Sequence, residues 1–126
     1  MGVLRPDFFF PAPFFGKIRR SEVEAVLVYM TAGSMEEARK IASALVEERL
    51  AACANILPQM ESVYQWKGKI ENDAEVVVIA KTKASLAEKL NARVLELHSY
   101  EVPCVVTMPI TGGNPEFLAW IGEETQ

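Results

Sequence analysis

The sequence predicts a single α+β domain in which strands and helices follow the order β-α-β-β-α-β, with a short helix at the end. Two segments have the apolar spacing of amphipathic helices, and apolar extended runs lie on both sides of them. The two central runs are separated only by Lys67-Gly68-Lys69, so they form a hairpin. This order is that of ferredoxin-like folds, a sandwich of two helices on one face of a four-stranded antiparallel sheet.

The first strand is predicted over residues 23–30, a short apolar run that ends at Thr31-Ala32-Gly33. The first helix is predicted to begin at Ser34, because Ser34 and Glu37 have the spacing of a capping box. It is expected to end near Arg49 or Leu50. Its apolar face consists of Ala38, Ile41, Ala42, Leu45 and Val46.

The central hairpin is predicted to be long. One arm runs from Ala52 past Pro58 to Trp66, and the return strand is predicted over residues 70–82. Arms of about fifteen residues, at roughly 3.3 Å per residue, reach near 50 Å, which exceeds the width of a domain of this size. We expect the overhanging strands to pair with another chain.

The second half repeats the helix and strand. Ser85 and Glu88 have capping-box spacing and predict a second helix, which buries Leu86, Leu90, Val94 and Leu97. The last strand is predicted over residues 102–108. Asn114 as N-cap and Pro115 at the first helical position predict the short closing helix.

Two further features predict an oligomer and a leader. Residues 76–80 and 102–108 are apolar at consecutive positions, so both faces of the sheet need cover, although two helices cover only one. Residues 1–22 are rich in phenylalanine and proline and are expected to be a flexible leader before a single domain over residues 23–126. The alternative is an arm whose phenylalanines dock on a neighbouring subunit.

Composition and motifs argue against several classes of function. The 126 residues carry a net charge of −4, and the basic groups of the first twenty residues conceal a more acidic remainder, which argues against nucleic acid as a partner. No run approaches the roughly 20 apolar residues of a membrane span. The two cysteines lie in apolar sequence, which is typical of a reducing compartment and predicts a cytoplasmic protein. With one histidine and no nucleophile elbow, phosphate loop or dinucleotide motif, we expect no enzyme.

Several blocks resemble the CutA divalent-cation tolerance family in order and spacing. They are residues 49–56 (RLAACANI), 62–71 (SVYQWKGKIE), 81–83 (KTK) and 98–103 (HSYEVP). The resemblance implies a homotrimer of ferredoxin-like subunits, joined through their extended strands and linked to tolerance of divalent cations such as copper. Two positions depart from the family pattern. Ser99 stands where proline is usual, with a hydroxyl expected to bond the backbone, and the first strand offers Met30 where some members have a cysteine.

The resemblance to this family suggests three candidate metal ligands, namely Cys53, His98 and Glu101. Thiolates favour Cu(I), and imidazole with a carboxylate suits a divalent ion, so the preferred metal is copper, as Cu(II) or Cu(I), with another divalent metal as the alternative. Cys53 is equally compatible with a small core residue, and His98 with a structural residue at a helix C-terminus. A closed site needs ligands from more than one chain, because one protomer offers a single histidine.

A second set of residues predicts a cleft between subunits, namely Tyr64, Trp66, Lys81 and Tyr100. It would serve an alternative function, a trimeric signalling or scaffold module that binds a small anion or a protein partner. Cross-strand packing and a solvated lysine explain the same residues without a ligand. Three acidic residues alternate along one strand, namely Glu71, Asp73 and Glu75. They could form a weak acidic face for a metal ion, or they could simply be the solvent-exposed side of the strand. The preferred function is a non-enzymatic trimeric metal-binding protein with no obligatory cofactor and no nucleic-acid or membrane partner.

Overall fold

The computed structural model describes residues 24–126, so the predicted leader lies outside the described residues. The elements in chain order are β1 (Ala25–Ala32), α2 (Met35–Glu47), β2 (Cys53–Trp66), β3 (Lys69–Lys83), a 3-10 turn (Ala84–Leu86), α3 (Ala87–Leu97), β4 (Val105–Pro109) and α4 (Pro115–Glu123). The predicted order of strands and helices is therefore confirmed. None of the described helices is long and apolar enough to cross a membrane.

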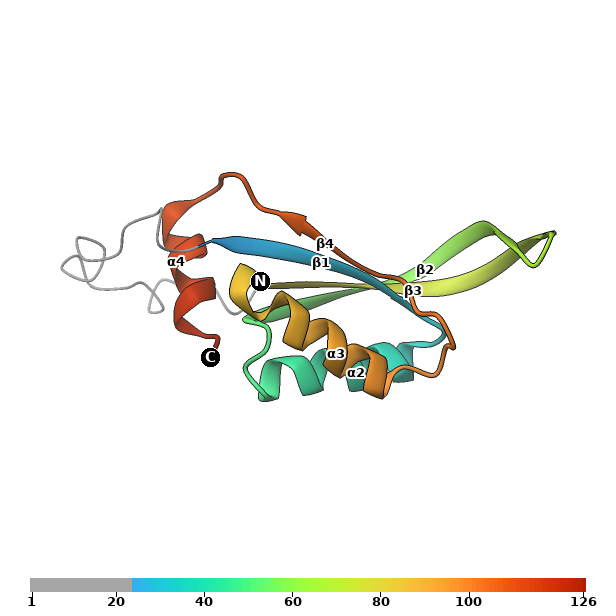
Figure 1. The fold of residues 1–126 in the computed structure, drawn as a ribbon, viewed down its shortest axis with the longest axis horizontal. Coiled ribbons are helices and arrows are strands. Elements are labelled where there is room, and N and C mark those ends of the chain that lie inside the picture. Colours follow the sequence, from blue (N-terminus) through green and yellow to red (C-terminus); the bar gives the residue numbers. More distant parts are fainter. Residues whose placement is uncertain (1–23) are drawn as a thin grey trace.

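The four strands form one antiparallel sheet in the order β2-β3-β1-β4. Figure 1 shows α2 and α3 side by side on one face of the sheet, and α4 at the end where β1 begins. The predicted α+β class and four-stranded antiparallel sheet are confirmed.

The main core lies between the sheet and the pair α2 and α3. Alternate residues of β1 and β3 point into it, because successive side chains of a strand face opposite sides. Apolar residues three and four positions apart on the helices meet them. The largest fully buried side chains of this core are Met30, Ile41, Leu45, Leu90, Val28, Val78 and Val94.

The β2-β3 hairpin extends beyond the other strands, as Figure 1 shows. Its turn is formed by Lys67 and Gly68, both with positive φ, which is the backbone that a two-residue hairpin loop requires. Pairing continues from Trp66 and Lys69 back to Cys53 and Lys81, with one irregularity between Leu57 and Met60. That irregularity follows Pro58, whose ring nitrogen cannot donate to the ladder, and Gln59 has a φ of 61°.

The predicted start of the second helix is wrong. Ser85 lies inside the 3-10 turn, and α3 begins after Leu86 without any side-chain cap. The turn is held instead by the backbone N–H of Ala84, which donates to the Glu24 carbonyl at 2.7 Å. A tertiary hydrogen bond therefore replaces the predicted local one, and capping-box spacing alone cannot reveal that.

Two strand boundaries also differ from the prediction. β1 continues to Ala32, because Thr31 and Ala32 still pair with Val77 and Val76 of β3. β4 begins at Val105 and not at residue 102, since Pro103 lacks an N–H and the segment before Val105 leaves the ladder. The closing helix begins as predicted, with the Asn114 side chain accepting from the Glu116 N–H at 3.1 Å.

The second face of the sheet is covered only in part. Trp120 and Ile121 of α4 pack against Ala25 and Cys53 at one end. Farther along this face and on the overhanging hairpin, several large apolar side chains are exposed, among them Leu57, Val63, Trp66, Ile70, Val106 and Met108. Exposed apolar area of this extent marks a surface that another molecule covers.

Substitution in the core is expected to separate from substitution on the helix surface. Leu45 is fully buried, so Leu45→Ala should lower the free energy of unfolding by about 2–5 kcal/mol. The neighbouring Val46 was wrongly predicted on the apolar face and is 40% exposed, so Val46→Ala should change this free energy by no more than about 0.5 kcal/mol. Urea unfolding followed by circular dichroism measures both. Equal losses would contradict the assigned face of α2.

Candidate functional site

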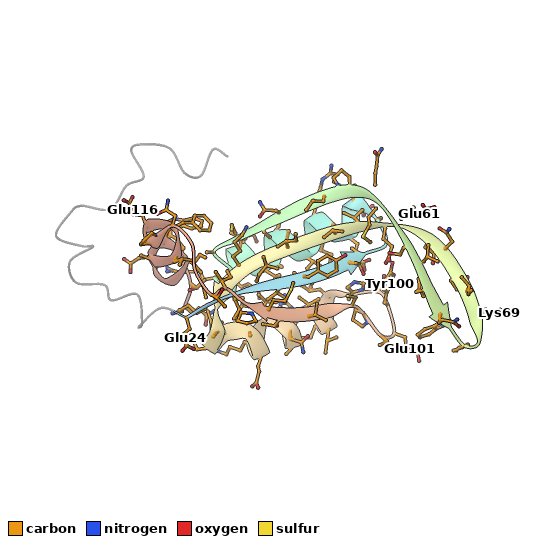
Figure 2. All side chains as sticks on the ribbon, turned by 90° about the horizontal axis from the view of Figure 1, so that it is seen from above. Glu24, Glu61, Lys69, Tyr100, Glu101 and Glu116 are labelled. Carbon is orange, nitrogen blue, oxygen red and sulfur yellow. The ribbon has the colours of Figure 1, made fainter. Side chains whose placement is uncertain are left out.

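A groove of about 780 Å³ lies between the overhanging hairpin and residues 98–104, the joining segment between α3 and β4. Figure 2 shows Glu61 on the hairpin, with Tyr100 and Glu101 on the joining segment. Both β1 and the hairpin contribute to its lining, which consists of Tyr29, Thr31, Met60, Glu61, Ser62, Val63, Tyr64, Trp66, Asp73, Glu75, Tyr100, Glu101, Val102 and Cys104. Three of the four predicted cleft residues, Tyr64, Trp66 and Tyr100, thus lie in one groove of a single chain.

Two tyrosine–carboxylate pairs lie in this groove, one within the hairpin and one between the joining segment and β3. The Tyr64 hydroxyl donates to Asp73, and the Tyr100 hydroxyl donates to Glu75 at 2.8 Å. The hydrogen bond to Asp73 and the neighbouring acidic charges raise the pKa of Tyr64 to about 12. Burial, followed by the bond to Glu75, raises the pKa of Tyr100 as well. Both phenols therefore stay protonated at neutral pH and act as donors to the carboxylates.

His98 is a buried C-cap residue of α3, and both of its ring nitrogens are engaged. The Tyr100 backbone N–H donates to Nδ1 at 3.1 Å, so Nδ1 is the acceptor. Nε2 then carries the hydrogen and donates to the Thr31 carbonyl at 2.7 Å. To bind a metal, the imidazole must give up one of these two bonds.

The joining segment is also anchored to the start of α2. Ser34 caps this helix as predicted, accepting from the Glu37 N–H at 3.1 Å. The carboxylate of Glu37 does not complete the capping box at Ser34. It accepts from the N–H of Gly33 at 3.2 Å and from the N–H of Ser99 at 2.7 Å. Glu37 therefore holds the joining segment in place against the start of α2.

Ser99 takes a role that a proline could not take. Its backbone N–H donates to Glu37, and its hydroxyl also lies within hydrogen-bonding reach of that carboxylate. Burial alone would raise the pKa of Glu37, but the bonds from Ser99 and Gly33 and the nearby His98 lower it in total.

Cys53 and Lys81 face each other across β2 and β3, outside the groove. Lys81 Nζ lies 2.7 Å from Asn55 Oδ1 and 4.0 Å from Cys53 Sγ, and it lies over the Phe117 ring at 5.9 Å. Burial raises the pKa of the Cys53 thiol, and Lys81 opposes that effect. The thiol is therefore a poor nucleophile in this chain, and Lys81 supplies no charge to the groove lining.

Glu101 lines the groove, whereas His98 is buried beside it and Cys53 lies outside it. Among residues 24–126, no group of three or more His, Cys, Asp and Glu side chains is arranged to hold a metal ion. A site built from Cys53, His98 and Glu101 thus needs ligands from more than one copy of the chain.

The sequence did not single out Tyr29, Met60 or Cys104 as site residues, yet all three line the groove. Met60 could not be placed because the irregularity after Leu57 changes the register of the hairpin. Tyr29 could have been assigned from strand alternation, since it opposes Ile79 on the face away from α2 and α3. Asp73 and Glu75, predicted as one row, do lie together in the lining.

The fold and the groove define a small α+β protein with a groove lined by acidic and aromatic side chains. The profile of the CutA1 divalent ion tolerance protein family matches residues 26–124. The chain belongs to this family.

Relatives and solved structures agree over most of the domain. The chain is 48% identical to the divalent-cation tolerance protein CutA of Thermus thermophilus over 79% of this chain and 96% of that one. It is 43% identical to the chloroplastic protein CutA of Arabidopsis thaliana over 90% of this chain and 64% of that one. The solved CutA1 structure from Oryza sativa has a TM-score of 0.80 at 42% identity, covering 82% of this chain and 95% of that chain. The Thermus thermophilus structure has a TM-score of 0.79 at 47% identity, covering 81% and 99%.

The Glu37 anchor predicts a defined acid sensitivity. Because the folded pKa of Glu37 lies below its ordinary 4.5, its stabilisation is complete above pH 4.5 and is lost as the pH falls through the folded value. Glu37→Gln should cost about 1.5–3 kcal/mol at neutral pH and flatten the decline in stability on acidification. Urea unfolding between pH 7 and about pH 3 measures this. The exposed neighbour Glu36 provides the control, and an equal effect of Glu36→Gln would contradict the anchor.

Proposed function

We propose that the protein is a non-enzymatic homotrimer that binds divalent metal, preferably copper, and serves tolerance of divalent cations. The observation that carries this proposal is the match to the divalent ion tolerance family over residues 26–124. The chain spans 64%, 59% and 55% of the length of its Arabidopsis, rice and mouse relatives. An activity of those longer proteins is therefore only proposed for this chain.

Trimer formation is supported by the exposed apolar side of the sheet and by the overhanging hairpin. Val106 and Met108 are 49% and 44% exposed on β4, although strands of a monomeric sheet usually present polar residues to water. Both outer strands, β2 and β4, have an unpaired edge within residues 24–126. Pairing of such edges with neighbouring copies would satisfy their backbone groups and cover the apolar side chains.

Light scattering of the full chain should give three times the chain mass of 14.0 kDa. Val106→Asp should shift the mass toward one chain, because a charge buried in an interface is strongly unfavourable. Leu95 of α3 has a similar exposure of 51%, so Leu95→Asp is a matched control that should leave the trimer intact. A wild-type protein that is monomeric at micromolar concentration would refute this assembly.

Metal binding is proposed at sites shared between copies. Cys53 would supply a soft ligand for copper, Glu101 an exposed carboxylate, and His98 an imidazole after release of one of its hydrogen bonds. Cys53 and Glu101 lie at separate places in one chain, so the assembly must bring the Cys53 of one copy toward the joint of another. That requirement links the metal proposal to the trimer.

Calorimetric titration of the metal-free protein with Cu(II), and with Cu(I) under reducing conditions, tests the ligands. Cys53→Ala and Glu101→Gln should each weaken copper binding about tenfold or more, the equivalent of 1.4 kcal/mol. Cys104→Ala removes the other thiol, which lies in the groove, and should leave the affinity within about twofold. Loss of affinity in Cys104→Ala alone would move the site away from Cys53.

The cytoplasmic location is proposed on the two free thiols, which suit a reducing compartment. Two plant relatives are named as chloroplastic proteins, and the solved relative from Archaeoglobus fulgidus is named as a periplasmic protein. Relatives are thus named for several compartments. The alternative is a trimeric signalling or scaffold module that binds a small anion or a protein partner in clefts between subunits. Its anion-binding form depended on Lys81, which lies outside the groove of the single chain. The geometry therefore favours a cation as the ligand.

A further inference from the structure

We propose that α4 is a lid over the Cys53 thiol, which closes the thiol off from soft metal ions and other thiol-seeking agents until the helix swings away. The lid is distinct from the groove, because α4 covers the opposite end of the sheet (Figure 1). For copper, the inference rests on the proposed function, in which Cys53 is a ligand. For other thiol reagents it rests on the structure alone.

Cys53 lies beneath α4. Its side chain is 8% exposed and belongs to a buried apolar cluster with Ala25 and Ala52. The two largest members of this cluster, Trp120 and Ile121, come from α4. A metal–thiolate bond such as that to zinc is about 2.3 Å long, so a soft metal ion reaches this thiol only after its cover moves.

The cluster under α4 is separate from the main core. The main core lies between the sheet and the helices α2 and α3, and it shares none of its buried residues with the cluster of Cys53. Regions of a protein that have separate cores can open in separate steps, each with its own free energy. Departure of α4 would therefore expose Cys53 while the main core stays packed.

Three hydrogen bonds tie the C-terminal end of α4, and the residues after it, to the loop that follows α2. The Arg49 side chain donates to the Glu123 carbonyl at 3.0 Å. Gln126 donates twice, from its backbone N–H to the Arg49 carbonyl at 3.0 Å and from its side-chain amide to the Glu48 carbonyl at 2.7 Å. Both side-chain bonds lie at exposed positions, where water competes for the same groups, so they latch the helix reversibly.

The segment before α4 has the properties of a hinge. The Ile110 N–H donates to the Ala25 carbonyl at 3.0 Å, and residues 111–113 then form neither helix nor strand and are exposed. Gly112 has open space around its Cα, and Gly113 has a φ of 156°, a backbone conformation that favours glycine. Two consecutive glycines can absorb the change in backbone angles that a swing of α4 requires.

The cap of α4 lies within the part that would move. The Asn114 side chain accepts from the Glu116 N–H at 3.1 Å, and Pro115 occupies the first helical position. These contacts lie on the α4 side of the two glycines, so they are retained when the hinge turns. Opening therefore breaks the apolar contacts of α4 and its latch bonds, and it leaves the hydrogen bonds of the four-stranded sheet intact.

Alkylation of Cys53 by iodoacetamide measures how often the lid opens. The full-length protein carries Cys104→Ala, so that Cys53 is its one thiol, and mass spectrometry follows the reaction. Arg49→Ala, which removes a latch bond, should accelerate alkylation about two- to tenfold. Gly112→Ala fits without a clash and restricts the open state, so it should slow alkylation about two- to fivefold. The control Arg39→Ala removes the same charge from an exposed position on α2 and should stay within about twofold.

A second comparison separates opening of the lid from unfolding of the whole chain. Leu45→Ala weakens the main core, so it would accelerate alkylation by about tenfold or more if Cys53 became exposed only on global unfolding. Opening of the lid predicts a change within about threefold. Trp120→Ala removes the largest side chain of the cover and should accelerate the reaction about tenfold or more. Hydrogen exchange should also be faster for the amides of α4 than for those of α2.

Three outcomes would overturn the proposal. Alkylation of Cys53 in the Cys104→Ala protein at the rate measured in urea would mean that nothing covers the thiol. Unchanged rates in both Arg49→Ala and Trp120→Ala would mean that α4 does not control access, and equal acceleration in Leu45→Ala and Trp120→Ala would assign exposure to global unfolding. If Arg49→Ala fails to fold by circular dichroism, slower alkylation in Gly112→Ala still decides for the lid, and an unchanged rate decides against it. These reactions contain no metal, so failure of the copper proposal would leave their results unchanged.

Discussion

The buried imidazole of His98 connects the end of α3, the end of β1 and the joining segment. Its Nε2 donates to the Thr31 carbonyl, and its Nδ1 accepts from the Tyr100 N–H. The ring also packs against that of Tyr100, with centroids 4.5 Å apart. Because Tyr100 and Glu101 form one wall of the groove, the position of that wall depends on the two hydrogen bonds of this imidazole. Glu37 reinforces the same joint from α2, through Ser99.

The second wall of the groove follows from sheet geometry. β2 and β3 continue past the ends of β1 and β4, so the distal hairpin has no neighbouring strand within the described residues. The concavity arises where this overhang meets the joint. The same overhang leaves backbone edges and apolar side chains exposed, and this is the physical basis for the proposed trimer. The proposed assembly thus depends on this feature of the fold.

The charges decide which ligand chemistry suits the groove. Lys81 is held by Asn55 near the α4 end of the sheet, and the groove contains carboxylates oriented by tyrosine hydroxyls. A protein linked to divalent cations by its family thus presents an acidic concavity whose acids are too dispersed, within one chain, to enclose a metal ion. Of the proposed metal ligands Cys53, His98 and Glu101, only Glu101 lines this groove.

The sequence by itself determined the order of elements, the Ser34 and Asn114 caps and the long hairpin, because each depends on residues close together in the chain. Tyr64, Trp66 and Tyr100, predicted for a cleft between subunits, line one groove of a single chain. Only the tertiary structure decided that Ser85 is no cap, that both nitrogens of His98 are engaged and that Lys81 lies away from the groove. These features depend on partners far apart in the sequence, such as Thr31 with His98, and on a hairpin register that shifts after Leu57. Local patterns carry no information on such pairings, which the packing of the sheet against its helices establishes.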